Sequence, residues 1–203
     1  MPTKKISRRG RPRGFDVDAA IATAAQLFHQ RGYDGVGVAE LSKTIGITAP
    51  SLYAAFGSKR DLFEQALQYY GAAEGGWLAA ALASSEQLED AIATLFTQAA
   101  AVYSAKPDCP GCLVLDGTRN CGDQEARALT LTRREMTRQV ICDRIATHPK
   151  LTADQAETLA DYAMTILVGL SSSARDGVAV EALQTTAQIA AGGFAEQLSH
   201  YID

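Results

Sequence analysis

Residues 44–56 constrain the fold more than any other stretch of the chain. Gly46 permits the positive φ that ends one helix and opens a turn, and Thr48 is a favourable N-cap for the helix that follows. Leu52 and Phe56 are spaced i, i+4, so they can anchor that second helix to a core. Small side chains keep its other face slim. The pattern predicts a helix-turn-helix whose second helix can enter the major groove of DNA.

The rest of the chain favours helices over strands. It is rich in alanine, has six prolines among 203 residues, and lacks the alternating β-branched runs that mark strands. We therefore expect an all-α protein with helices over residues 17–32, 38–45, 58–82, 87–104, 123–147, 152–175 and 180–201. Gly71, Gly75 and Gly76 predict a kink in the helix over residues 58–82.

Charge is distributed unevenly and suggests three regions. Residues 1–60 hold ten Lys or Arg and four Asp or Glu, a net charge of +6, whereas residues 61–203 carry a net charge of −10. We expect a basic arm at 1–14, a helix-turn-helix domain at 15–60, and a helical effector-binding and dimerisation domain at 61–203. The arm contains Arg9, Arg11 and Arg13, which could insert into a narrow minor groove; the alternative is a solubilising tail.

Several classes of protein are disfavoured. No apolar run reaches the ~18 residues of a membrane helix, and no apolar segment follows the basic N-terminus as in a secretory signal, so we expect a cytoplasmic protein without membrane contact. No nucleophile-elbow, zinc-protease, P-loop or dinucleotide motif is present, so no enzymatic activity and no cofactor are expected. The three histidines are scattered, with no ligand spacing to a cysteine, and no metal site is assigned.

Cys109 and Cys112 form a Cys-x-x-Cys pair that allows several interpretations. Such a pair can bind a soft metal ion, form a disulfide or trap an electrophile. Against a sensing role, Cys112 precedes an apolar Leu-Val-Leu segment, where a cysteine acts as a small hydrophobe. Cys142 is expected to be structural, and Cys121 is intermediate between the two interpretations.

The N-terminal pattern resembles the DNA-binding domain of the TetR/AcrR family of bacterial regulators over residues 15–63. The matching positions are Ala24, Leu27, Phe28, Gly32, Tyr33, Leu41, Gly46, Ile47, Thr48, Ser51, Leu52, Tyr53, Phe56, Lys59 and Leu62. Gly37 departs from the Ser or Thr that often caps the second helix in the family, although Gly is an acceptable N-cap. The resemblance implies about nine helices, a homodimer through the last two, a ligand pocket among the middle helices, and repression relieved by an effector.

Carried onto this chain, the resemblance implies a palindromic operator and a set of contacts with it. The start of the recognition helix would approach base edges through Thr48, Ala49, Pro50 and Ser51. Phosphate contacts would come from Tyr53, Lys59 and Lys43. Only two of these residues are polar base readers, so the arm and DNA shape should supply much of the specificity.

The expected effector is a small molecule, or soft-metal or thiol chemistry at the two neighbouring cysteines. The candidate effector-binding residues are Tyr70, Trp77, Phe96, Tyr103, Cys109 and Cys112, although aromatic residues at helical spacing serve equally well as core. The dimer should form through residues 152–175 and 180–201, and a charged residue in place of Leu167 or Leu183 should give monomers or unfolded protein. The function predicted is a DNA-binding repressor released by an effector; the alternative is a helical protein-binding adaptor without a specific operator.

Overall fold

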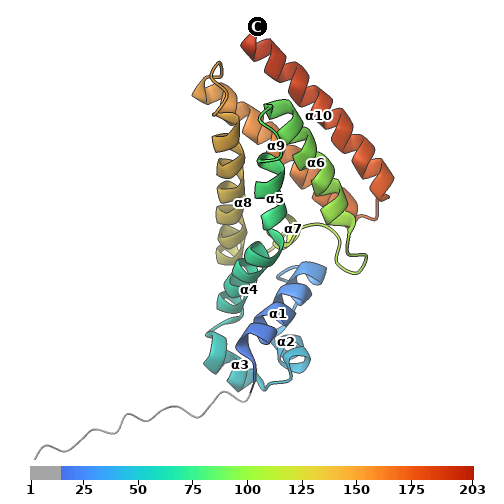
Figure 1. The fold of residues 1–203 in the computed structure, drawn as a ribbon. Coiled ribbons are helices and arrows are strands. Elements are labelled where there is room, and N and C mark those ends of the chain that lie inside the picture. The colour runs from blue at the N-terminus through green and yellow to red at the C-terminus, as the bar shows by residue number, and fades with distance from the viewer. Residues whose placement is uncertain (1–14) are drawn as a thin grey trace, which may run out of the picture.

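The computed structural model describes residues 15–203, which fold into ten α-helices without a strand, and the predicted all-α class is confirmed. The helices are α1 Val17–Arg31, α2 Val38–Ile45, α3 Ala49–Phe56, α4 Lys59–Glu74, α5 Gly76–Leu82, α6 Leu88–Ser104, α7 Leu113–Asp116, α8 Gln124–Ile145, α9 Ala153–Arg175 and α10 Val180–Ile202. Helices α1–α3 form one end of an elongated molecule, and the C-terminus lies at the opposite end (Figure 1).

The smaller hydrophobic core holds α1–α3 against α4. Phe28 of α1 meets Phe63 of α4 edge-on, with ring centroids 5.0 Å apart, and Tyr33 packs on both rings. Leu62 and Leu67 of α4 are buried in the same cluster. This core therefore extends beyond residue 60, and the first half of α4 packs with α1–α3 in one cluster.

The larger core lies among α5, α6, α8, α9 and α10. Helix α10 contributes a stripe of buried residues at helical spacing and packs along α6 (Figure 1): Leu183, Ala187, Ala190, Phe194 and Leu198. Leu167 and Leu183 are 1% and 2% exposed within one protomer. Because these two leucines fill the protomer's own core, a charge at either position is expected to unfold the protein. The outward face of α10 carries Ile189, which is 71% exposed.

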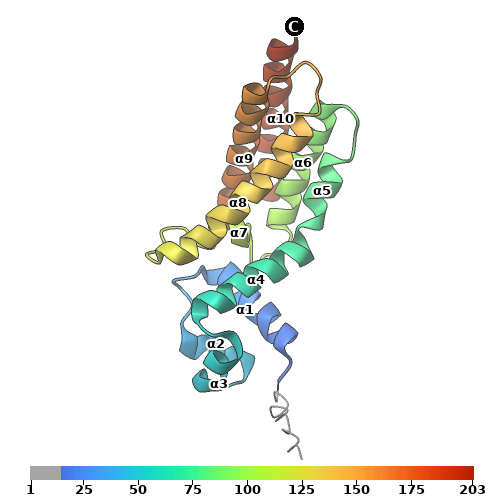
Figure 2. The same ribbon diagram turned by 90° about the vertical axis from the view of Figure 1, so that its left-hand side faces the viewer.

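Helix α4 is the covalent connection between the two cores, as the side view shows (Figure 2). The expected helix over residues 58–82 is divided at Gly75, which ends α4 and precedes α5. Glycine has a low helix propensity, so three glycines within six residues favour a break at this point.

A second connection joins the end of α1 to the segment between α7 and α8. The Tyr33 N–H donates to the Gly117 carbonyl at 2.7 Å, and the Gly122 N–H donates to the Asp34 carboxylate at 2.9 Å. The Tyr33 hydroxyl also donates to Asp123 at 3.1 Å. The N-terminal helices are thus held to the rest of the protein at a point separate from α4.

Over residues 15–203, no helix combines the length and apolar character needed to cross a lipid bilayer.

Candidate DNA-binding surface and effector cavity

The turn between α2 and α3 has the conformation that the sequence predicts. Gly46 adopts a left-handed conformation with φ 80° and ψ 29°. The N–H groups of Gly46 and Ile47 both donate to the Ser42 carbonyl at 3.0 Å, which closes the C-terminal end of α2. A side chain at Gly46 would be strained by this φ, so the glycine sets the angle between the two helices.

Helix α3 has a side-chain N-cap and is anchored to the smaller hydrophobic core. Thr48 Oγ1 accepts a hydrogen bond from the Ser51 N–H at 3.3 Å, and the two hydroxyl oxygens lie 2.9 Å apart. Pro50 occupies the first turn, where its missing N–H leaves no hydrogen bond unmade. Leu52 and Phe56 are buried, so the opposite face of this eight-residue helix is presented to solvent.

The predicted DNA contacts on α2 and α3 share this outer surface. Thr48, Pro50, Ser51 and Lys43 are exposed, and Ala49 is partly exposed. Tyr53 is 49% exposed despite its large ring, which leaves its hydroxyl available to a phosphate. The surface is slim, polar at its N-terminal end, and free of acidic side chains on α3. Arg9, Arg11 and Arg13 lie outside the described residues.

Lys59 occupies a different position from the other predicted phosphate ligands. It is the first residue of α4, and its Nζ lies 4.0 Å from the centroid of the Tyr33 ring. Desolvation by partial burial lowers the pKa of Lys59, although the nearby Asp34 acts in the opposite direction. The ammonium is therefore turned towards the junction with the 117–123 segment.

A cavity of about 240 Å³ lies where α4–α9 meet. Three aromatic rings from different helices line it, namely Tyr70, Trp77 and Tyr103, and the last two meet at 86° with centroids 5.9 Å apart. The remaining wall is largely aliphatic: Leu78, Val114, Leu115, Met136, Val140 and Leu167. Met136 and Val140 are also exposed, so the cavity opens to solvent across α8.

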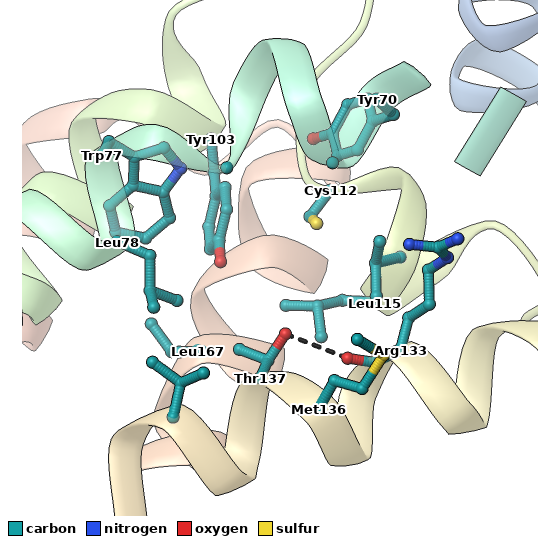
Figure 3. Close-up of a pocket in the computed structure, with 14 residues that line it drawn as sticks. Tyr70, Trp77, Leu78, Tyr103, Cys112, Leu115, Arg133, Met136, Thr137 and Leu167 are labelled. Atoms are coloured by element: carbon teal, nitrogen blue, oxygen red, sulfur yellow. Dashed lines mark hydrogen bonds between the residues drawn. The ribbon is translucent and has the colours of Figure 1, made fainter. Parts of the chain in front are cut away.

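The polar groups of this cavity are few. Arg133 and Thr137 come from α8, and Cys112 precedes α7 (Figure 3). The Thr137 hydroxyl donates to the Arg133 carbonyl at 3.0 Å, whereas no hydrogen bond or ion pair joins the Arg133 guanidinium to another described side chain. Burial raises the pKa values of the Cys112 thiol and the Tyr103 hydroxyl, so both groups are protonated at neutral pH.

The predicted effector residues are divided among three environments. Tyr70, Trp77, Tyr103 and Cys112 line the cavity. Phe96 is not among its lining residues: it is fully buried in the larger core, with its ring centroid 6.4 Å from that of Tyr162.

Cys109 lines a second, more polar cleft of about 610 Å³. This cleft is bounded by α1, α4 and residues 105–109, and it includes His29 and Tyr69. The two cysteines of the Cys-x-x-Cys pair thus face different cavities. Over the described part of the chain, no group of three or more His, Cys, Asp and Glu side chains is arranged to hold a metal ion.

A buried carboxylate that sequence reasoning missed connects the cavity wall to α1. Asp116, the last residue of α7, accepts a hydrogen bond from the Ser171 hydroxyl of α9. Arg119 lies 3.3 Å and Arg175 lies 3.9 Å from its carboxylate oxygens. Arg175 also donates to the His29 carbonyl at 3.0 Å, at the C-terminal end of α1. An acidic residue directly after an apolar Leu-Val-Leu segment is the one sequence signal for this network.

The same network includes the main chain beside Cys112. The Cys112 N–H donates to the Ser171 hydroxyl at 2.8 Å. Gly111 has φ 83°, and a Cβ at this position would lie 2.9 Å from the Ser171 carbonyl oxygen. The approach of the 111–112 segment to α9 therefore requires glycine.

An exposed, slim helix after a tight turn, joined to a helical domain with an internal cavity, is the architecture of a ligand-responsive helix-turn-helix regulator. Residues 20–66 match the family model described as bacterial regulatory proteins, tetR family. The chain is 40% identical to the HTH-type transcriptional repressor BdcR of Escherichia coli K12 over 192 residues, which cover 94% of this chain and 95% of that protein. The chain belongs to the TetR family.

Two further relatives agree with this assignment. The HTH-type transcriptional repressor ComR of Escherichia coli K12 is 33% identical over 186 residues, covering 88% of this chain and 89% of that protein. A cysteine mutant of the TetR family transcriptional regulator CifR, solved with a 26-bp double-strand operator DNA, superimposes with a TM-score of 0.81 at 33% identity. That match covers 89% of this chain and 98% of the CifR chain.

Proposed function

We propose that this protein is a homodimeric transcriptional repressor that binds a palindromic operator and releases it when a small molecule occupies the cavity among α4–α9. The observation that carries the proposal is the exposed N-terminal half of α3, with its hydroxyl groups presented on a helix anchored by Leu52 and Phe56. BdcR is named as a repressor, and CifR was solved on operator DNA, which supports the same role here. The proposal includes a cytoplasmic location, where the chromosome lies.

In this proposal the residues of the DNA surface have separate tasks. Thr48, Ala49, Pro50 and Ser51 approach base edges, and the two hydroxyls exchange their mutual hydrogen bond for bonds to the bases. Tyr53, Lys43 and Lys59 contact phosphates; Lys59 must first leave the Tyr33 ring. The arm adds Arg9, Arg11 and Arg13 in the minor groove.

The proposed dimer forms through the outward faces of α9 and α10. The exposed Ile189 and the small residues around it on α10 form a surface that a second protomer can approach closely. A symmetric dimer presents two copies of α3, and these must lie about one DNA turn apart, ~34 Å, to bind two half-sites. An effector that changes the tilt of α4 changes this spacing, since α4 joins the cavity to the recognition domain.

A small molecule is favoured over thiol or soft-metal chemistry as the signal. Cys109 and Cys112 line different cavities, so one ion shared by both sulfurs requires rearrangement of the loop. The raised pKa of Cys112 keeps its thiol protonated, and the thiolate is the reactive form. The three aromatic rings and the aliphatic wall are instead suited to an organic ligand.

The test is selection of binding sites from a random double-stranded DNA library by the full-length protein, followed by titration of the selected site. We expect a palindromic site, and we expect Ser51→Glu to weaken its binding more than about 100-fold, because a carboxylate would face the DNA backbone and bases at short range. Ser84→Glu makes the same change at an exposed position between α5 and α6 and should bind as the wild type does.

Failure to select any site, or equal binding by Ser51→Glu and wild type, would contradict the repressor proposal and favour the protein-binding adaptor.

The same titrations at several salt concentrations test the role of the N-terminal arm. Removing residues 1–13 should lower the slope of log affinity against log salt by ~0.9 for each lost phosphate contact.

A further inference from the structure

We propose that the cavity among α4–α9 takes a small aromatic monocarboxylate, whose ring lies near Trp77 and Tyr103 and whose carboxylate pairs with Arg133. This assignment rests on the proposed function, in which this cavity is the effector site, and it adds the chemical class of the effector. It follows from the one charged side chain among the described residues that line the cavity, from the size of the cavity, and from the separation of its charged and aromatic ends.

Arg133 is the feature that requires an anion. Among the described residues lining the cavity it is the only charged side chain, and no hydrogen bond or ion pair joins its guanidinium to another described side chain. A partly buried guanidinium has lost some of its water and gains most from a partner that accepts two hydrogen bonds in one plane. A carboxylate provides that geometry.

The lining also limits the charge of the ligand. A phosphate ester with two negative charges would require further cations or several N–H donors. The other polar side chains described in the lining are neutral: Cys112, Thr137 and the hydroxyls of Tyr70 and Tyr103. One guanidinium neutralises one negative charge, so the cavity suits a monoanion.

Size and shape then define the rest of the molecule. The volume of about 240 Å³ is below the ~300–1,000 Å³ of sites for drug-sized ligands, so one ring with a short side chain is the appropriate scale. Trp77 and Leu78 lie at one end of the cavity and Arg133 at the other (Figure 3). The Trp77 and Tyr103 rings meet at 86°, an arrangement in which a third ring can pack on a face or an edge.

The position of Arg133 connects ligand charge to the recognition domain. Its Nη1 lies 3.8 Å from the place that a Cβ of Gly71 would occupy, so the guanidinium of α8 lies directly against α4. A carboxylate held by Arg133 would therefore be bound beside the helix that carries the helix-turn-helix. Neutral aromatic molecules could fill the apolar end without reaching this contact.

Trp77 provides a direct measurement, because it is the only tryptophan in the chain and it lines the cavity. The full-length protein is titrated with benzoate, phenylacetate and 3-phenylpropanoate, and in parallel with the matching neutral amides. We expect a saturable change in Trp77 emission, with at least one acid binding about 10-fold or more tightly than its amide.

Two arginine variants on α8 test the assigned contact. Arg133→Met should weaken binding of the acid about 10- to 100-fold and leave the weak binding of the amide unchanged. Arg127→Met removes the same charge from an exposed position on α8 outside this cavity, and it should bind as the wild type does. The proposal is overturned if no acid binds, if acids and amides bind equally, or if Arg133→Met binds the acid as tightly as wild type.

The same samples separate this proposal from the one on which it rests. If the acid occupies the cavity but the selected operator is bound with unchanged affinity, the ligand class stands and the effector role of the cavity fails. If no acid alters Trp77 emission, the ligand class fails, while operator binding and its loss in Ser51→Glu still test the repressor.

Discussion

Helix α3 presents its hydroxyl groups on the outside of the molecule, whereas the cavity is lined by side chains from six helices. On α3, the two anchors and the two hydroxyls lie within nine consecutive residues, Thr48–Phe56. The cavity lining extends from Tyr70 to Leu167 and depends on how α4–α9 pack. Exposed side chains can therefore change with little effect on folding, but a change in the cavity acts on the packing of the larger domain.

In the proposed function, this difference lets the cavity act on the DNA-binding surface. The DNA surface is locally determined and behaves as a unit, so its internal geometry need not change when a ligand binds. The cavity is shared among several helices, one of which is α4, so its occupancy can alter their relative positions.

The largest expected effect comes from comparing a charge introduced inside the protomer with the same charge introduced on its outer face. Leu183→Asp should unfold the protein, because an unpaired carboxylate in the larger core costs more than about 4 kcal/mol. Ile189→Asp introduces the same charge on the exposed face of α10 and should give a folded monomer. Circular dichroism and sedimentation at micromolar concentration measure the two outcomes, and a dimeric Ile189→Asp protein would place the interface elsewhere.

An intermediate effect is expected from the buried carboxylate between the two regions. Asp116→Ala should lower the free energy of unfolding by about 2–3 kcal/mol, because Arg175 loses its ion-pair partner and the Ser171 hydroxyl loses its hydrogen-bond acceptor. The cost is below that of a fully buried pair since Arg175 is partly exposed. Asp176→Ala, at an exposed position, should change stability by less than about 0.5 kcal/mol. Equal denaturation midpoints for the two variants would show that the Asp116 network contributes nothing.

The smallest effect compares two glycines with nearly the same backbone angle. Gly46 and Gly111 have φ values of 80° and 83°, but a Cβ at Gly46 has nothing within 4 Å, whereas one at Gly111 would lie 2.9 Å from the Ser171 carbonyl oxygen. Gly46→Ala should cost the left-handed strain alone, about 1–2 kcal/mol. Gly111→Ala should cost more, because α9 must also shift. Urea denaturation gives both values, and the reverse order would mean that the 111–112 segment adjusts freely.

The sequence predicts the N-terminal region in detail because its determinants are local. Gly46, Thr48 and Pro50 act within one turn, and the structure gives each the position that its chemistry favours. The cavity was predicted only in part. Tyr70, Trp77 and Tyr103 are aromatic residues at helical spacing and line the cavity. Phe96 fits the same sequence pattern, but it is buried in the larger core.

The missed residues depend on contacts between distant segments. Arg133 has no distinguishing sequence context, since α8 carries arginines around much of its circumference, and only the packing of α8 on α4 turns this one towards the cavity. The Asp116–Arg175 ion pair joins residues almost sixty positions apart. The periodicity of a single sequence contains no signal for a contact between segments so far apart.

The two connections of the N-terminal helices to the rest of the protein have a mechanical consequence. One is the continuous chain of α4, and the other is the group of bonds from Tyr33 and from the end of α1 to Gly117 and Arg175. A rigid body fixed at two separate points keeps a single degree of freedom, rotation about the line through those points. If both connections persist, each recognition helix can move only along one arc about that line. A displacement of a few tenths of an ångström near that axis becomes a larger displacement at α3, because α3 lies at the end of the molecule away from the larger core (Figure 1).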